Sequence, residues 1–407
     1  MAALKVLRGT ANSALVPKYW SRKYLEDSFE KDPLKPFYGS IIATEYDLKK
    51  AKGDTIEVPI VGLLTGSGVT DDGNYDGDIG ALPLYNMPVT IHEHGRAAGL
   101  NGKMTEKSAA LRTRTLTMKG LTKWRAAFNA RAVIDALSGL KLHTLGGNVL
   151  GASGLALDGN GAQIQCVTQI APDYTHGDTA MRYYAGGQTA AQGAYNGRVA
   201  DINKLNKTHY VFGTKVIEDV RRIAEKTVDG NGNLISPIER VKVNGRMLYV
   251  MLITQEQARD LKADPAWRTG HENVDVRGLE NSIFSGALGV WDGVLLVETD
   301  LLHRRFGVGG GGVTATEYFD STSVPCASGE AVHRALFLGA NAVAFALGEA
   351  PEYMEFYADN AKTKWAARVS SIYGVSKIAK YISMGADATL INDTEVGCIV
   401  VDTAVVV

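Results

Sequence analysis

An extended hairpin with an acidic tip is the feature that most limits how this chain can fold. Residues 55–61 (TIEVPIV) and 88–94 (PVTIHEH) alternate apolar and polar side chains, as half-buried strands do. Between them, residues 65–80 (TGSGVTDDGNYDGDIG) are rich in Gly and Asp and contain no Lys or Arg. Such a hairpin is too long and too polar at its end to lie in a core. We therefore expect residues 53–101 to project from the body of the molecule and to need a partner.

The carboxylates at the tip allow two interpretations. Their spacing partly resembles a calcium-binding loop, but the EF-hand loop requires a Glu at its twelfth position, where Leu82 stands if Asp71 is first. A solvated tip, or a tip that contacts a basic neighbouring surface, fits the sequence better. The four carboxylates are Asp71, Asp72, Asp76 and Asp78.

A long cationic helix is predicted over residues 103–138. Leu121, Trp124 and Phe128 recur at steps of three and four residues, and only Gly120 weakens the pattern inside the helix. Basic residues greatly outnumber acidic ones, so we expect one wet, cationic face. A solvated face and contact with a polyanion both stay open at this point. The basic residues are Lys103, Lys107, Arg112, Arg114, Lys119, Lys123, Arg125 and Arg131.

Shorter patterns predict the remaining elements. Residues 1–52 suit an arm that lies on another surface, and residues 144–200 suit loops with short strands. Thr254 and Gln257 have the N-cap and N3 pattern of a capping box. We expect helices at 214–227, 254–263 and 331–346, the last with a stripe of small residues, a hairpin at 241–253, and strands near 367–375 and 396–401.

Patterns that would indicate chemistry are weak. Residues 307–312 (GVGGGG) match a dinucleotide-binding spacing, but β-prone residues follow, so the phosphate-binding helix start is missing. His92 and His94 share a strand face without an obvious third metal ligand. No GxSxG, HExxH or P-loop pattern is present. We expect no enzymatic activity, no cofactor and no metal.

Composition excludes several other classes of protein. The net charge of −1 gives no global field for nucleic acid or membrane. The longest uncharged apolar run of helical type, residues 335–348, is shorter than the roughly 20 residues that cross a bilayer. The three cysteines are far apart, which argues against a disulfide framework or zinc site and fits a reducing compartment. No signal peptide is evident.

Residues 277–297 (RGLENSIFSGALGVWDGVLLV) place large side chains in a glycine-punctuated loop that ends in a strand. Nothing reactive lies among them. Phe284 and Trp291 are therefore expected to pack against another surface.

Five stretches, taken in order, resemble the N-four-type podophage branch of the tailed-phage major capsid proteins, which have the Hong Kong 97-type α+β fold. They are KGDTIEVPIVGLLTGSGVT (52–70), NGKMTEK (101–107), YVMLITQEQARDL (249–261), RGLENSIFSGALGVWDGV (277–294) and ALFLGANAVAFALG (335–348). The resemblance implies a shell protein that assembles into hexamers and pentamers around double-stranded DNA. It also implies localisation in the virion after assembly in the host cytoplasm.

The resemblance further implies a domain plan and partners. The domains are an N-terminal arm (1–52), an extended loop (53–101), a peripheral domain (102–205) with a spine helix (103–138), an axial domain (206–345) and a return to the peripheral domain (346–407). The four tip aspartates would contact a neighbouring subunit, the eight basic residues are candidates to face DNA, and Phe284 and Trp291 would pack in the axial domain. A separate scaffolding protein, a portal and decoration proteins are expected partners, with no membrane. The alternatives are an encapsulin-like nanocompartment shell and, remotely, a nucleotide-dependent enzyme that uses Gly307–Gly312.

Overall fold

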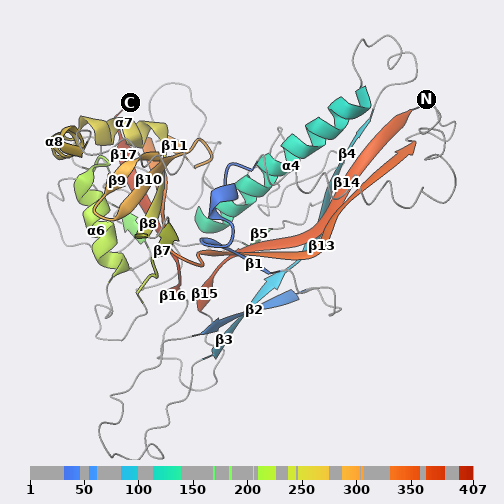
Figure 1. Cartoon of the computed structure of the whole chain (residues 1–407), viewed down its shortest axis with the longest axis horizontal. Helices are drawn as coiled ribbons and strands as arrows, with labels where there is room; N and C mark the ends of the chain where they lie inside the picture. The colour runs from blue at the N-terminus through green and yellow to red at the C-terminus, as the bar shows by residue number, and fades with distance from the viewer. Residues whose placement is uncertain are drawn as a thin grey trace, which may run out of the picture.

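The fold is α+β and consists of two main sheets joined by one long helix (Figure 1). In Figure 1 a compact part carries the shorter helices, and a ribbon of strands extends away from it with the long helix alongside. This computed structural model describes residues 32–45, 55–61, 84–99, 113–138, 168–169, 183–185, 205, 210–225, 237–243, 246–274, 287–302, 304–306, 331–357, 364–380 and 394–406.

The extended ribbon belongs to a five-stranded sheet whose order is β1-β13-β14-β4, with β5 also paired to β14. β13 and β14 are antiparallel along nearly their whole length, with register shifts between Leu347 and Glu352. β14 also pairs with β4, and β1 lies parallel to β13. The strands are β1 (Ile42–Glu45), β4 (His92–Gly99), β5 (Thr168–Gln169), β13 (Val343–Tyr357) and β14 (Trp365–Lys377).

The long helix α4 spans Thr113–Ser138 and confirms the prediction for that range. Residues 103–112 lie outside the described residues. Leu121 and Phe128 are buried, and residues 132–138 are buried on every side. An apolar cluster joins the last turns of α4 to side chains from both sheets, including Val133, Leu336 and Tyr373. The end of the helix is thus enclosed at the junction of the two sheets.

The second sheet has eight strands in the order β6-β17-β12-β8-β10-β9, with β11 beside β12 and β7 beside β8. One face, with Tyr249, Met251 and Val294, packs in a cluster with helix residues such as Val216 and Leu261. The opposite face meets the end of α4. The strands are β6 (Tyr183–Ala185), β7 (Val241–Val243), β8 (Arg246–Ile253), β9 (Ala287–Trp291), β10 (Val294–Glu298), β11 (Arg304–Phe306), β12 (Ala331–Leu338) and β17 (Cys398–Val405); the helices are α6 (Thr214–Ala224), α7 (Gln255–Ala263) and α8 (Pro265–Val274).

The predicted hairpin is present as β2 (Thr55–Val61) and β3 (Leu84–Thr90), which pair with each other as a separate two-stranded sheet. Its base is anchored, because Val58 and Val89 are buried in a cluster with Ala344 of β13. A short pair, β15 (Ala379–Lys380) and β16 (Thr394–Glu395), follows β14. The predicted second strand is divided, since β3 ends at Thr90 and β4 begins at His92. The tip with its four aspartates lies outside the described residues.

The helix predicted over residues 331–346 is wrong. This segment forms β12, a turn and the start of β13, and Asn341 in the turn has a φ of +53°. β12 and the first residues of β13 are buried on both faces, so this segment is largely apolar, and periodicity alone does not distinguish it from a buried helix.

Two predictions about the ends of the chain are also corrected. Residues 32–45 do not lie on a foreign surface, since Leu34, Phe37 and Ile41 are buried in the main cluster of this subunit. A short 3-10 helix, η1 (Lys35–Phe37), starts this segment. Strand β17 does not return to the ribbon but pairs with β12 in the eight-stranded sheet.

Candidate functional site

The most distinctive side-chain arrangements in the described part of the chain are contacts between its helices and sheets. Within it, no group of three or more His, Cys, Asp or Glu is placed to hold a metal ion. None of its helices combines the length and apolarity that a bilayer crossing needs. Residues 307–312, the proposed nucleotide loop, lie outside the described residues, as does Phe284.

An aromatic stack fastens α4 to the five-stranded sheet. The His94 ring on β4 lies 4.1 Å from the Phe128 ring and 5.3 Å from the Trp124 ring, both nearly parallel to it. Tyr373 on β14 meets His94 edge-on at 6.3 Å. The strand face that His92 and His94 share is therefore, at His94, a packed contact with the helix.

Arg125 on α4 is buried in the same contact, with 4% of its surface exposed. Its Nη1 donates to the Ser371 hydroxyl at 2.9 Å, and its guanidinium lies over the Tyr373 ring. It cannot face DNA, so the predicted wet cationic face is wrong at this position. A buried polar partner on another strand, which the sequence pattern does not reveal, accounts for the difference.

The other basic residues differ in position. Lys119 and Lys123 are exposed and Arg131 is half-buried. Arg114 lies in the first turn of the helix, while Lys103, Lys107 and Arg112 lie outside the described residues.

Burial and the nearby Arg125 charge lower the pKa of His94 to about 4. The imidazole is therefore neutral at neutral pH, and the adjacent charge belongs to Arg125.

Beyond Tyr373, the Tyr38 hydroxyl donates to Asp32 at 2.9 Å, and burial raises the pKa of the Asp32 carboxyl. The N-terminal segment thus contributes a carboxyl to this region.

A buried ion pair lies where α4 meets the eight-stranded sheet. Arg334 on β12 and Asp402 on β17 are paired directly across the strands, and each is 1% exposed. Two parallel hydrogen bonds of 2.9 and 2.8 Å join them. Arg334 Nη1 also donates to the carbonyl of Ser138, the last residue of α4, at 2.5 Å.

Trp291, the anchor singled out in residues 277–297, packs within its own subunit. Its ring lies 5.7 Å from the Trp267 ring of α8, and its Nε1 donates to Glu218 of α6 at 3.3 Å. The following turn has positive φ at Asp292 and Gly293, as a tight two-residue hairpin requires.

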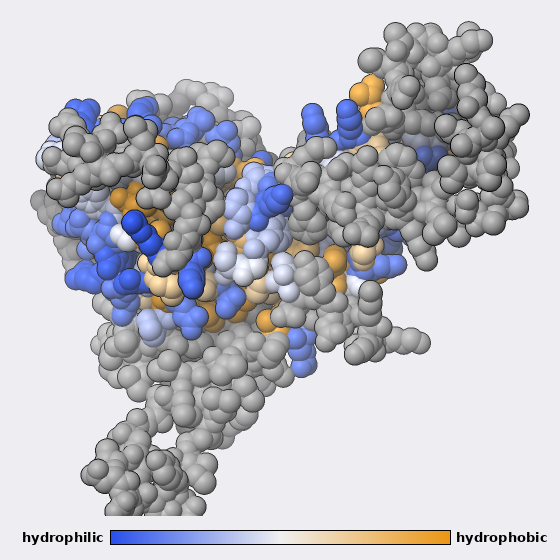
Figure 2. All heavy atoms as spheres, in the orientation of Figure 1, coloured by the Kyte–Doolittle hydropathy of each residue, from blue (hydrophilic) through white to orange (hydrophobic). Residues whose placement is uncertain are grey.

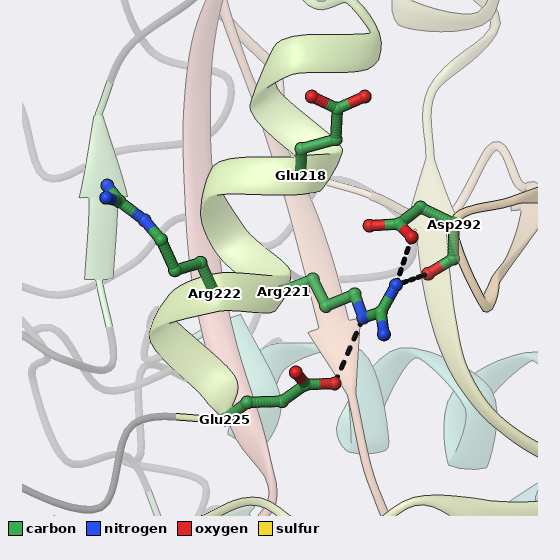
Figure 3. Close-up of a pocket in the computed structure, with 5 residues that line it drawn as sticks. All are labelled: Glu218, Arg221, Arg222, Glu225 and Asp292. Atoms are coloured by element: carbon green, nitrogen blue, oxygen red, sulfur yellow. Dashed lines mark hydrogen bonds and ion pairs between the residues drawn. The ribbon is translucent and has the colours of Figure 1, made fainter.

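A polar surface pocket adjoins this turn. Figure 3 shows Arg221 extending from α6 between Glu225 and Asp292. Arg221 donates to Glu225 at 3.0 Å, to the Asp292 carbonyl at 2.7 Å and to the Asp292 carboxylate. These bonds fix the hairpin on α6, and Arg222 also lines the pocket.

The far end of the ribbon exposes large apolar side chains. Met354, Phe356 and Tyr357 of β13 are 42%, 36% and 49% exposed, while Tyr353 is buried beneath α4 beside Leu121. In Figure 2, by contrast, the visible described surface of the compact part is largely hydrophilic. The ribbon end is therefore a candidate contact surface.

Comparison with known proteins agrees with this arrangement. A family model described as "Phage capsid protein" matches residues 10–407. No protein of curated function matches the sequence.

Three similar solved structures are phage capsids or heads of low sequence identity. The capsid of Ralstonia phage GP4 is 19% identical with a TM-score of 0.64, covering 90% of this chain and 88% of that one. The capsid of cyanophage Pam1 is 18% identical with a TM-score of 0.59 and the same coverage. The head of Helicobacter pylori bacteriophage KHP40 is 14% identical with a TM-score of 0.58, covering 92% and 91%. At these identities the likeness concerns the fold, and it confirms the predicted Hong Kong 97-type capsid fold.

Proposed function

Because the chain belongs to the phage capsid protein family, we propose that it is the major capsid subunit whose hexamers and pentamers close into an icosahedral shell around the double-stranded DNA of a tailed phage. Assembly takes place in the host cytoplasm, and the finished subunit is part of the virion. The subunit acts by packing and carries out no catalysis. A separate scaffolding protein, a portal and decoration proteins complete the particle.

The projecting elements are the observation that supports this function best. A two-stranded hairpin is only marginally stable alone, and β2–β3 pairs with no further strand among the described residues. The ribbon end leaves Met354, Phe356 and Tyr357 exposed. Surfaces of this kind gain stability when a neighbouring copy covers them, so much of the stability of the subunit comes from assembly.

Two charged surfaces have distinct roles in the proposal. The tip aspartates Asp71, Asp72, Asp76 and Asp78 contact a cationic patch on a neighbouring subunit, which sets register more than affinity. The cations of the helix segment other than Arg125 face the packaged DNA and screen phosphate charge without reading sequence. Exposed Lys119 and Lys123 fit this role.

Deletion of residues 66–80 tests the proposal. The base of the hairpin keeps Val58 and Val89, so the variant should remain folded and soluble, yet closed shells should be absent in electron micrographs. A matched control replaces the four tip aspartates by Asn, which keeps the length of the loop and removes its charge. Closed shells from the deletion variant would show that the hairpin does not clamp a neighbour.

A further inference from the structure

The Arg334–Asp402 pair connects two bodies that pack mainly through apolar contacts. Both partners belong to the eight-stranded sheet, whereas the third hydrogen bond of Arg334 goes to Ser138 at the end of α4. Beside it, the Cys398 thiol donates to the Leu137 carbonyl at 3.7 Å. Along its length, α4 is fastened to the other sheet through Arg125 and Ser371. The spine helix is thus bonded to both sheets.

The chemistry of this pair favours a geometric function over a stabilising one. A buried ion pair adds little net stability, because desolvation offsets the Coulombic attraction. The planar guanidinium fork, however, fixes direction, since both bonds to Asp402 and the bond to Ser138 require one orientation. The positive charge also lies at the negative end of the helix macrodipole.

We propose that Arg334 and Asp402 form a latch that fixes the angle between α4 and the eight-stranded sheet, and through this angle the curvature of the assembled shell. The effect on curvature rests on the proposed shell function, whereas the angle is a property of the single subunit.

The length of the helix makes the angle important. At about 1.5 Å per residue, the 26 residues of α4 span about 39 Å. A rotation of about 5° at the Ser138 end therefore moves the other end by about 3 Å. A displacement of that size alters the fit of the ribbon against a neighbour.

The double variant Arg334→Met/Asp402→Leu tests the latch, because it removes both charges and leaves neither partner buried alone. Nitroxide labels at Lys119→Cys on α4 and Met247→Cys on β8, both exposed positions, report the distance between the two bodies by pulsed electron paramagnetic resonance. Cys166 and Cys326 are replaced by Ser in every sample. Lys119 lies about 28 Å from the Ser138 end of α4, so a rotation of about 5° should shift or broaden the distance distribution by about 2 Å relative to the wild-type pair.

Two further variants sharpen the test. Thr403 lies next to Asp402 on β17, and its hydroxyl accepts a buried hydrogen bond from Gln257 of α7. Thr403→Val removes this bond without a change in the contacts of α4, so its distance distribution should match that of the wild type. Arg334→Lys keeps the charge but loses the fork, and it gives the same test if the double variant does not fold. An unchanged distribution in the folded double variant, or in Arg334→Lys, would overturn the latch.

The shells provide the second readout. Electron micrographs of the double variant should show particles of mixed diameter, whereas Thr403→Val should give the wild-type diameter. Uniform wild-type shells from the double variant would refute the control of curvature. Failure of the wild-type chain to assemble even with a scaffolding protein would count against the proposed function, and the distance measurement would still decide the latch.

Discussion

Protonation of His94 should weaken the attachment of α4 to the five-stranded sheet. The neutral ring stacks on Trp124 and on Phe128, whose rings also stack on each other, and the nearby charge that lowers its pKa is the guanidinium of Arg125 on α4. The guanidinium of Arg96, on the same strand as His94, lies over the Trp124 ring. The phenol of Tyr373 faces it from β14. A protonated imidazole would add a third positive charge to this contact.

The magnitude follows from the difference in pKa between the folded and unfolded states. Folding lowers the pKa of His94 from 6.5 to about 4. The unfolded chain therefore takes up the proton first, and the stability of the fold decreases as pH falls from about 6.5 to about 4. A difference of about 2.5 in pKa corresponds to about 3 kcal/mol, which is fully lost below the folded-state pKa.

Urea denaturation of the unassembled subunit, followed by tryptophan fluorescence near pH 7.5 and near pH 4, measures this loss. Other groups also affect stability on acidification, including Asp32 and Asp260, whose carboxyl pKa values are raised by burial. The informative quantity is therefore the difference between the wild type and His94→Phe, which keeps an aromatic ring in the stack. The variant should lose about 3 kcal/mol less stability on acidification than the wild type does.

A matched control is His92→Phe, two residues earlier on the same strand. It should remain as acid-sensitive as the wild type. Equal acid sensitivity of His94→Phe and the wild type would refute this reasoning.

Three further predictions concern packing. Gly374→Ala should lower the free energy of unfolding by about 1–3 kcal/mol, because a Cβ there would lie 2.2 Å from the Thr90 carbonyl oxygen. Gly120 has open space around it, so Gly120→Ala should raise that free energy by about 0.5–1 kcal/mol in the same urea titration. Asp264→Ala should lower the thermal midpoint more than Asp264→Asn does, since the carboxylate accepts hydrogen bonds at the starts of both α6 and α8; equal midpoints would contradict this capping function. Trp291→Ala should destabilise the subunit by about 1–3 kcal/mol, less than the loss of a fully buried tryptophan because the side chain is half-buried; denaturation measures this, and a neutral result would mean that its packing on α8 is unimportant.

Much of the local structure was predictable because periodicity and capping residues are local signals. The aromatic repeat of α4, the amphipathic pattern of α6 and the Thr254 capping box all appear as expected. The hairpin β2–β3 and the strands near residues 367–375 and 396–401 are also confirmed.

The predictions that the structure contradicts concern residues whose conformation or burial is decided by partners far away in the sequence. Residues 331–346 contain small apolar residues that suit either a helix or a buried strand, and pairing with β17, more than sixty residues later in the chain, selects the strand. Arg334 interrupts that apolar run, but its partner Asp402 cannot be identified from spacing. Arg125 was placed on a wet face for the same reason, because Ser371 is its partner only in three dimensions.

One signal in the sequence could have located the helix contact. Trp124 and Phe128 lie one helical turn apart, and His94 shares the face of its strand with His92. Aromatic residues at that spacing present a flat surface on which a ring from a neighbouring strand can stack.

Electron microscopy of the purified full-length chain tests the central claim most directly. The claim is that this subunit completes its exposed hairpin and ribbon by packing against copies of itself. Closed shells, or at least hexameric and pentameric capsomers, are the expected result, with a scaffolding protein added where the chain alone does not close. A strictly monomeric protein under every assembly condition would contradict the account.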